Sequence, residues 1–211
     1  MRLRVTDPQG ATATDLVTIT VGNTRPTATI ALPSPGTTWK VGDPIAFRGS
    51  ATDTQDGAVP AARLAWSLIL HHCPSNCHTH PIQSWLGVDR GTFTTPDHEY
   101  PAHLELRLTA RDSGGLTDTR SVRLDPRTVD LRLETRPDGL TLGFDASQAT
   151  AQFTRRVIIG SRHSISAATT QLPWGWRRYS FRYWSDGGAP THNIIAPATN
   201  TTYTALYTRS R

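Results

Sequence analysis

The sequence predicts an all-β protein in which a tandem β-sandwich is followed by a smaller all-β domain. Apolar and polar residues alternate with the period of a β-strand over many short segments, and Pro and Gly clusters separate those segments. No segment repeats its apolar residues with the period of an amphipathic helix. Two segments also resemble each other at a fixed spacing, as expected of tandem domains. Short strands joined by many turns are therefore the expected architecture.

Composition limits the classes of partner. The chain has 211 residues, enough for about two ordinary domains, and its formal charge of +5 is carried by scattered arginines. Nucleic-acid binding would need a basic stripe with interleaved aromatic residues. Trp174–Trp184 comes nearest, but its period-two alternation is typical of a half-buried strand, so we expect no nucleic-acid partner. No run of 18 apolar residues is present, so no membrane span is expected.

Residues 1–22 read as a strand, a Pro-Gln-Gly turn and a second strand. The pattern returns in Leu108–Leu124. A shift of 105 residues places Asp7 on Asp112, Gly10 on Gly115, Thr12 on Thr117, Thr14 on Thr119 and Val17 on Val122. We predict that residues 1–22 are the last hairpin of an upstream β-domain that the sequence cuts short. Because an isolated hairpin is marginal in water, it should dock onto its neighbour, pair with a second chain as a dimer, or fray, and we expect it to dock.

The start of the chain bears on localisation. No apolar segment of a signal peptide follows Met1, and the chain opens within a strand pattern. An export signal is therefore expected upstream, and we expect a secreted, extracellular protein.

Residues 23–126 are predicted to form a complete β-sandwich. The segment Ala51–Gly57, and Leu106–Leu116 with its Asp-x-x-Gly turn, resemble the polycystic-kidney-disease (PKD) type of immunoglobulin-like domain. That family usually has Trp-x-Phe-Gly-Asp-Gly where this chain has Trp66-Ser-Leu-Ile-Leu-His-His, so the resemblance implies the sandwich and leaves the subfamily open. The expected strands are Thr27–Leu32, Pro44–Thr52, Arg63–His72, Ser84–Asp89, His103–Asp112 and Thr117–Leu124.

Residues 127–211 are predicted to form the smaller all-β domain. Tyr179–Gly188 and Thr201–Tyr207 resemble small β-repeats at the C-termini of secreted bacterial proteins. The whole order of segments resembles the C-terminal region of secreted, PQQ-dependent sugar dehydrogenases of the sorbosone-dehydrogenase type. Those enzymes keep their quinone chemistry in a propeller domain, so the resemblance implies an accessory region. The expected strands are Val129–Glu134, Leu140–Phe144, Gln152–Ile159, His163–Ala168, Arg178–Trp184, Thr191–Ile195 and Thr202–Tyr207.

The segment Leu70–Trp85 holds both cysteines and four of the eight histidines of the chain. Cys73 and Cys77 are close enough in sequence for a disulfide across a turn, which is the expected state in an exported β-protein. The alternative is a zinc site formed by both thiolates and two histidines, although Cys-x3-Cys-His-x-His is not a standard finger spacing.

The histidines of this segment suggest a metal site. His72 continues the apolar row of its strand, and His71 points away from that row. If the segment after Cys77 is extended, His78 and His80 project from one side and could bind one zinc or copper ion, with a third imidazole from His71 or His72. The segment Asp97–Tyr100, which includes His98, could add a ligand or a general base. Alternatively, the imidazoles only hydrogen-bond carbonyl groups around a disulfide.

Two further sets of residues are candidate sites. Asp53, Asp56 and Asp112 should lie at one end of the sandwich and could bind calcium, although Asp also simply caps turns. Aromatic residues near the C-terminus could bind sugar rings or form a core, the candidates for binding being Trp174, Trp176 and Trp184.

Two functions of different kinds follow. The first is a non-catalytic extracellular accessory region of a secreted carbohydrate-active enzyme, which could bind glycan or a polymer surface. The second is a small metal-dependent enzyme, a hydrolase or an oxidase, with its site in residues 71–80. Neither a nucleophile elbow nor a pair of glycosidase carboxylates can be placed in the sequence.

Overall fold

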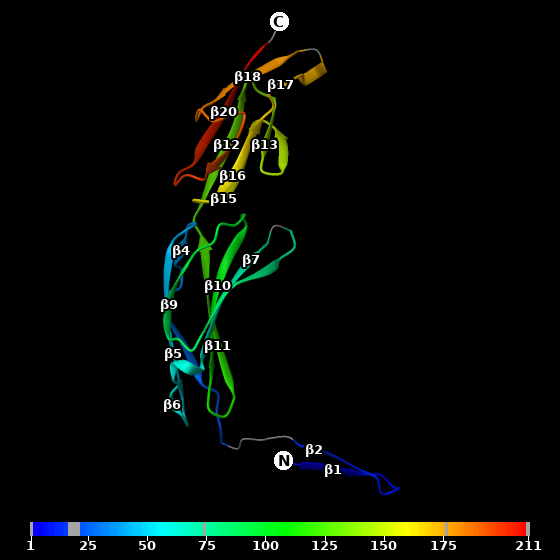
Figure 1. The fold of residues 1–211 in the computed structure, drawn as a ribbon, viewed down its shortest axis with the longest axis vertical. Coiled ribbons are helices and arrows are strands. Elements are labelled where there is room, and N and C mark those ends of the chain that lie inside the picture. The colour runs from blue at the N-terminus through cyan, green and yellow to red at the C-terminus, as the bar shows by residue number, and fades with distance from the viewer. Residues whose placement is uncertain (1, 17–21, 74, 176, 210–211) are drawn as a thin grey trace.

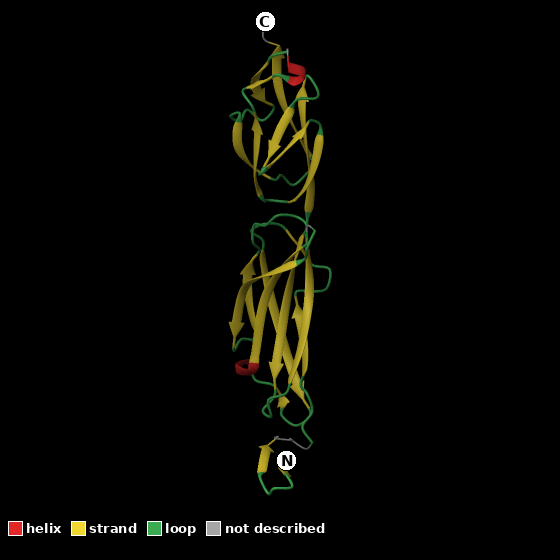
Figure 2. Cartoon of the chain, turned by 90° about the vertical axis from the view of Figure 1, so that its right-hand side faces the viewer, coloured by secondary structure: helices red, strands yellow, loops and turns green. Residues whose placement is uncertain are grey.

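A computed structural model describes residues 2–16, 22–73, 75–175 and 177–209, without the side chain of Trp174. Regular structure in this part of the chain consists of strands and two three-residue 3-10 turns (Figures 1 and 2). The predicted all-β fold class is confirmed. No helix among the described residues is long and apolar enough to cross a membrane.

Two facing sheets form a sandwich from residues 23–126. The larger sheet has the spatial order β4 (Thr38–Trp39), β11 (Thr117–Pro126), β10 (Ala102–Arg111), β7 (Leu64–His72) and β8 (His78–Leu86). The facing sheet holds β3 (Thr27–Leu32), β5 (Pro44–Asp53), β6 (Gly57–Ala58) and β9 (Arg90–Thr94). The 3-10 turn η1 (Ala61–Arg63) precedes β7.

Alternation along β7 and β10 builds the core of the sandwich. Every second residue of each strand is buried, because successive side chains point to opposite faces of a sheet. Leu104, Leu106 and Leu108 of β10 are fully buried, and burying a leucine contributes about 1.5–3 kcal/mol. The inward row of β7 ends at His72, which is also buried. The inward-facing residues of β7 therefore place a titratable side chain, that of His72, at the end of the sandwich.

The C-terminal domain also has two sheets. One has the spatial order β15 (Phe153–Ile158), β12 (Thr128–Arg136), β20 (Thr201–Arg209), β18 (Tyr179–Trp184) and β17 (Thr170–Gln171). The other has the order β14 (Ser147–Thr150), β13 (Thr141–Phe144), β16 (Arg162–Ala167) and β19 (Thr191–Ile195). The 3-10 turn η2 (Pro173–Gly175) lies between β17 and β18. Leu131, Leu133 and Trp184 are among its most buried side chains.

The two domains lie end to end (Figure 1), and backbone amides donate hydrogen bonds across the junction. The amide of Val41 donates to the carbonyl of Ile159 at 3.0 Å, and the amide of Arg162 donates to Oδ2 of Asp97 at 3.1 Å. Ile158, at the end of β15, is fully buried in the core of the sandwich rather than in that of its own domain. The junction is thus a packed interface.

The N-terminal hairpin differs from the expectation that it docks. Strands β1 (Arg2–Thr6) and β2 (Thr12–Leu16) pair only with each other, and all their residues are exposed. Figure 1 shows the hairpin lying apart from the sandwich.

Candidate metal centre

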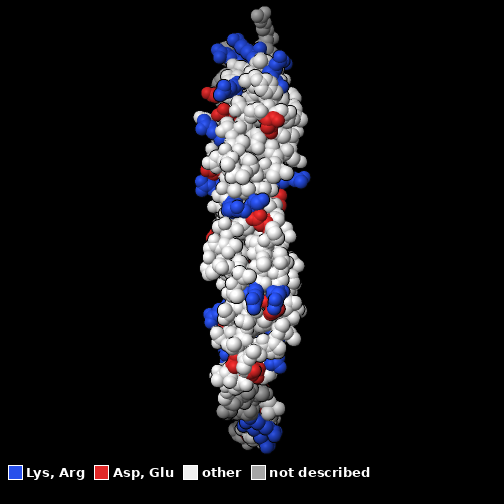
Figure 3. Space-filling view, turned by 90° about the vertical axis from the view of Figure 1, so that its left-hand side faces the viewer, with Lys and Arg blue, Asp and Glu red and all other residues white. Residues whose placement is uncertain are grey.

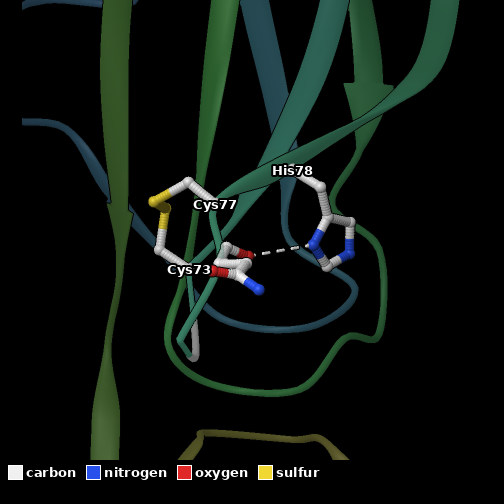
Figure 4. The surroundings of a disulfide bond; sticks show 4 residues. Cys73, Cys77 and His78 are labelled. Carbon is white, nitrogen blue, oxygen red and sulfur yellow. Dashed lines mark hydrogen bonds between the residues drawn. A yellow bond between two sulfur atoms is a disulfide. The ribbon is translucent and has the colours of Figure 1, made fainter.

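The β7–β8 hairpin brings the first histidines together. His72 ends β7 and pairs with His78, which begins β8. His80 lies two residues further along β8, so it projects to the same side as His78, as predicted. Cys73 and Cys77 form a disulfide across the connection, as Figure 4 shows. The predicted disulfide is confirmed, and it closes the turn that aligns the two strands.

His98 reaches the same place from the segment between β9 and β10. Its ring centroid lies 4.7 Å from that of His72 and 5.5 Å from that of His80. The ligand atoms of His72, His80 and His98 all lie within 4.8 Å of one another, and among the described residues this is the one group of three or more His, Cys, Asp or Glu side chains gathered this closely. His78 lies beside it, with its ring centroid 4.8 Å from that of His80.

The buried member of the cluster has an unused nitrogen. His72 is 9% exposed, and within the described chain its Nε2 atom has no hydrogen-bond partner. Burial lowers the pKa of His72, and the neighbouring His98 and His78 lower it further. His72 therefore tends to stay neutral, which is the form that binds metal. Since an unpaired buried polar atom is unfavourable, a bound ion would relieve this cost.

A hydrogen bond to the backbone sets the tautomer of His98. Its Nδ1 atom lies 3.0 Å from the backbone carbonyl of Glu99, which can only accept a hydrogen bond. Nδ1 is therefore protonated, and in the neutral ring the lone pair lies on Nε2. Such a carbonyl contact is typical of the groups that orient metal-binding histidines. In the same way, Nδ1 of His78 lies 3.3 Å from the carbonyl of Asn76 (Figure 4).

The cluster opens into a cleft of about 620 Å³ between the two domains. The sandwich supplies the four histidines with Asp97 and Glu99, and the C-terminal domain supplies the opposite wall. That wall consists of Asp145, Arg162 and His163. Sequence reasoning missed these three residues because no local pattern links them to the histidines. Only the end-to-end packing of the domains brings them close.

The geometry fits a metal after a small adjustment. Three imidazole nitrogens bound tetrahedrally to zinc at about 2.0–2.1 Å would lie roughly 3.4 Å apart. The present separations extend to 4.8 Å. His80 is exposed and can rotate inward without repacking a core. Three imidazoles leave at least one coordination position for water or an exogenous ligand.

His71 lies outside this cluster. As the alternation predicts, it projects from the opposite face of β7, where Nε2 lies 2.8 Å from Oε2 of Glu105 and the ring stacks on His103 at 4.6 Å. Burial alone would raise the pKa of Glu105, but hydrogen bonds from His71 and Arg107 lower it below its usual value. His71 is not placed to share an ion with His80, contrary to its inclusion among the candidate ligands.

The three candidate calcium ligands meet at the far end of the sandwich but use their oxygens otherwise. Asp53 Oδ1 caps a turn by accepting from the amides of Gln55 and Asp56. Both oxygens of Asp56 bind Ser113, and Asp112 accepts from its own turn through the amide of Leu116. Oδ2 of Asp53 is buried without a partner in the described part of the chain. Calcium binding at this end stays a prediction.

Of the three aromatic residues predicted to bind a ligand, the structure describes the side chain of Trp184. Trp184 is 1% exposed, packs in the core of the C-terminal domain, and donates from Nε1 to the carbonyl of Pro190 at 3.1 Å. It is a core residue and cannot present a face to a sugar, which corrects that candidate. Trp176 and the side chain of Trp174 lie outside the described part of the structure.

A Ser-His-Asp chain lies in the cleft wall and was not predicted. Ser161 Oγ lies 2.7 Å from Nε2 of His163, whose Nδ1 lies 2.8 Å from Oδ2 of Asp145. Ser161 is only 1% exposed, and its hydroxyl lies 2.6 Å from the carbonyl of Ile158. A nucleophile must reach its substrate. The hydrogen bonds between Ser161, His163 and Asp145 are therefore structural, and they hold β16 to the turn between β13 and β14.

Comparisons with known proteins add little. No protein-family model and no curated protein matches the sequence. Among solved structures, the chain is similar to BcpA, the major pilin subunit of Bacillus cereus, at 7% sequence identity and a TM-score of 0.32. The similarity covers 100% of this chain and 78% of that chain. A TM-score this low does not show a shared fold or function.

Proposed function

We propose that this chain is a non-catalytic, extracellular binding module that holds a zinc or copper ion at the junction of its two domains. The observation that carries the proposal is the cluster of His72, His80 and His98, with the buried and unpartnered Nε2 atom of His72. Neutral imidazoles are good ligands for both ions. A site at the junction would also fix the angle between the domains.

The acidic residues beside the cluster bear on the choice between binding and catalysis. A metal-dependent hydrolase needs a free carboxylate or histidine to move a proton near the bound water. Asp97 and Glu99 flank His98 in the sequence, and Asp97 accepts a hydrogen bond from the backbone of Arg162. This contact supports a role for Asp97 in joining the domains. A metal-dependent hydrolase or oxidase remains the second candidate because the three imidazoles leave a coordination position open.

An exported setting is part of the proposal. The Cys73–Cys77 disulfide is compatible with an oxidising compartment. The resemblance to the accessory region of sorbosone-type sugar dehydrogenases supports a role as a spacer in a secreted carbohydrate-active enzyme. Binding of a glycan or polymer surface is the finer form of this proposal. Pull-down on insoluble polysaccharide, with Trp174→Ala and Trp176→Ala as variants, would test it, and equal retention of parent and variants would exclude these two aromatic residues.

Metal titration tests the main proposal. The purified chain is freed of metal with chelator and titrated with Zn²⁺ and Cu²⁺ in a calorimeter, with one equivalent of either ion expected to bind. His80→Ala and His98→Ala should each weaken binding by at least about 10–100-fold, the range for losing even an outer-shell partner. His71→Gln is the matched control, because it sits beside His72 on the opposite face and keeps a side chain able to reach Glu105.

The outcomes separate the two candidates. Binding in the parent and in His71→Gln, with its loss in the other two variants, supports the metal site. Absence of stoichiometric binding by the parent would refute it. Hydrolysis of ester or phosphoester substrates, or oxidation of phenols, by the metal-loaded parent would favour the enzyme, provided that His80→Ala loses the activity at an unchanged Tm.

A further inference from the structure

The β1–β2 hairpin is a structural copy of the β10–β11 hairpin. The shift of 105 residues that aligns their sequences also aligns their strand pairing. Each pair of the first hairpin has a counterpart in the second: Arg2–Leu16 and Arg107–Ser121, Leu3–Asp15 and Leu108–Arg120, Arg4–Thr14 and Thr109–Thr119, Val5–Ala13 and Ala110–Asp118, Thr6–Thr12 and Arg111–Thr117. Register is set by which face must be buried.

The turns also match. Asp7 Oδ1 accepts from the amide of Ala11 at 2.8 Å, and Asp112 Oδ1 accepts from the amide of Leu116 at the same distance. Gly10 has a φ of 88° and its counterpart, Gly115, a φ of 93°. Both are in the left-handed region that favours glycine.

The two hairpins differ in how deeply their matching apolar side chains are buried. Leu108 and Ala110 are 0% exposed, whereas their counterparts Leu3 and Val5 are 60% and 58% exposed. Leu108 is covered by β5, where an added Cβ on Gly49 would lie 2.7 Å from its Cδ2 atom. The edge of β10 that faces away from β11 is paired with β7 along residues 102–110. The first hairpin thus keeps the register of a sandwich-closing pair without the sheet edge and facing sheet that such a pair needs.

We propose that the β1–β2 hairpin supplies the last two strands of a β-sandwich built like residues 23–126, and that its partner is such a sandwich lacking its own final hairpin. The partner would offer a β7-like strand edge, which binds the backbone of β1, and a β5-like facing strand, which covers Leu3 and Val5. A second copy of this chain offers no such place, because its own β10 and β11 already fill it. The inference is independent of the metal centre.

The chain as it stands gives the first test. Sedimentation should show a monomer, and hydrogen exchange at the amides of β1 should be fast while that of β10 is slow. A dimer in which β1 is protected would overturn the proposal, since a second copy would then be the partner.

A fusion tests the partner directly. Residues 23–106 are placed immediately before Arg2 of the full chain, so that the hairpin follows the body that residues 107–121 normally close. The β1 amides should then exchange as slowly as those of β10, with a second cooperative unfolding transition. Leu3→Asp with Val5→Asp in the same fusion is the control, and it should lose both the protection and the extra transition.

A repaired fusion guards against a trivial failure to fold. The β10–β11 hairpin makes two contacts that the β1–β2 hairpin lacks. Ser113 donates to Asp56 through its amide and hydroxyl, and Asp118 accepts from the amide of Ala28 at 2.9 Å. Pro8→Ser and Ala13→Asp place the same residue types at the matching positions. If neither fusion protects β1, or if the Asp control is protected equally, the proposal is wrong.

Discussion

The candidate metal centre depends on His72, which occupies a core position without being apolar. Replacing it with leucine would continue the row of Leu68 and Leu70. Instead, the buried imidazole keeps an unpartnered Nε2 atom within the described structure. A polar group in such a place lowers stability unless a partner satisfies it. The metal ion proposed to bind His72, His80 and His98 would supply that partner.

Acid should destabilise the metal-free protein partly through His72. Its pKa is lowered in the folded state from an ordinary value of 6.5 by burial and by His98 and His78, with Glu99 opposing and His80 adding to the shift. The unfolded chain therefore takes up the proton first, and the stability contributed by neutral His72 is lost as the pH falls below about 6.5. In urea unfolding, the free energy of unfolding should fall less between pH 7.5 and pH 5 for His72→Leu than for the parent. An identical pH dependence would contradict the lowered pKa.

His103, on the outer face of β10, should act in the same direction. Burial lowers its pKa, and Arg123 and His71 lower it further. The variant His103→Gln should also lose part of the acid sensitivity, while its metal binding stays unchanged because its ring lies outside the cluster. Calorimetric titration of this variant with Zn²⁺ provides the check, and weaker binding would show that the two faces of the sheet are coupled.

Single residues show how far the site could be predicted. The alternation of β7 placed His72 inward and His71 outward correctly, because strand periodicity is a local property. His80 followed from the same rule. His98 was only a possible addition, since it comes from a segment between β9 and β10 that shares no strand with the others. Arg162 and His163 were missed because they belong to another domain.

Several strands, namely β4, β6, β9, β14 and β17, were not predicted at all, and β8 was predicted only in part. The sequence indicated Ser84–Asp89, whereas the strand runs over His78–Leu86. Its first half is polar and contains Pro81, which is tolerated because β8 is an edge strand and its pairing with β7 shifts register directly after Pro81. Pairing with β7, fixed by the Cys73–Cys77 turn, decides its structure more than its own composition does.

Gly49 of β5 packs directly against side chains of the facing sheet. An added Cβ would lie 2.7 Å from Leu108 Cδ2 and 2.8 Å from the backbone oxygen of Thr29. Gly49→Ala should therefore lower the free energy of unfolding by about 1–3 kcal/mol, as expected of overpacking. Urea denaturation measures this change, and Ser50→Ala, exposed on the same strand, should change it by less than about 0.5 kcal/mol. Equal effects would show that the sheets can separate.

At the scale of the whole molecule, charged side chains are spread along the length of the face shown in Figure 3. On the side shown in Figure 3, basic side chains form small separate groups, several with acidic neighbours. The tandem all-β architecture was predictable because alternation, turns and the internal repeat agree. The end-to-end contact was not, since it depends on a few residues such as Val41 and Ile158 whose partners lie in the other domain.

The junction should couple the stabilities of the two domains. Ile158 belongs to β15 but is fully buried in the sandwich core. Ile158→Ala should cost about 2–5 kcal/mol through the cavity it leaves, and it should lower the protection of sandwich amides as well as those of β15. Hydrogen exchange checks this. Ile195→Ala, at a side chain 65% exposed, is the control, and a loss confined to the C-terminal domain would mean that the domains fold independently.

We propose that the imidazoles at this junction bind one metal ion. Crystals grown with Zn²⁺ and measured above and below the zinc absorption edge test it most directly. One anomalous peak should lie between His72, His80 and His98, bonded to a nitrogen of each at about 2.0–2.1 Å. Peaks only at other residues, or no peak despite saturating zinc, would contradict it.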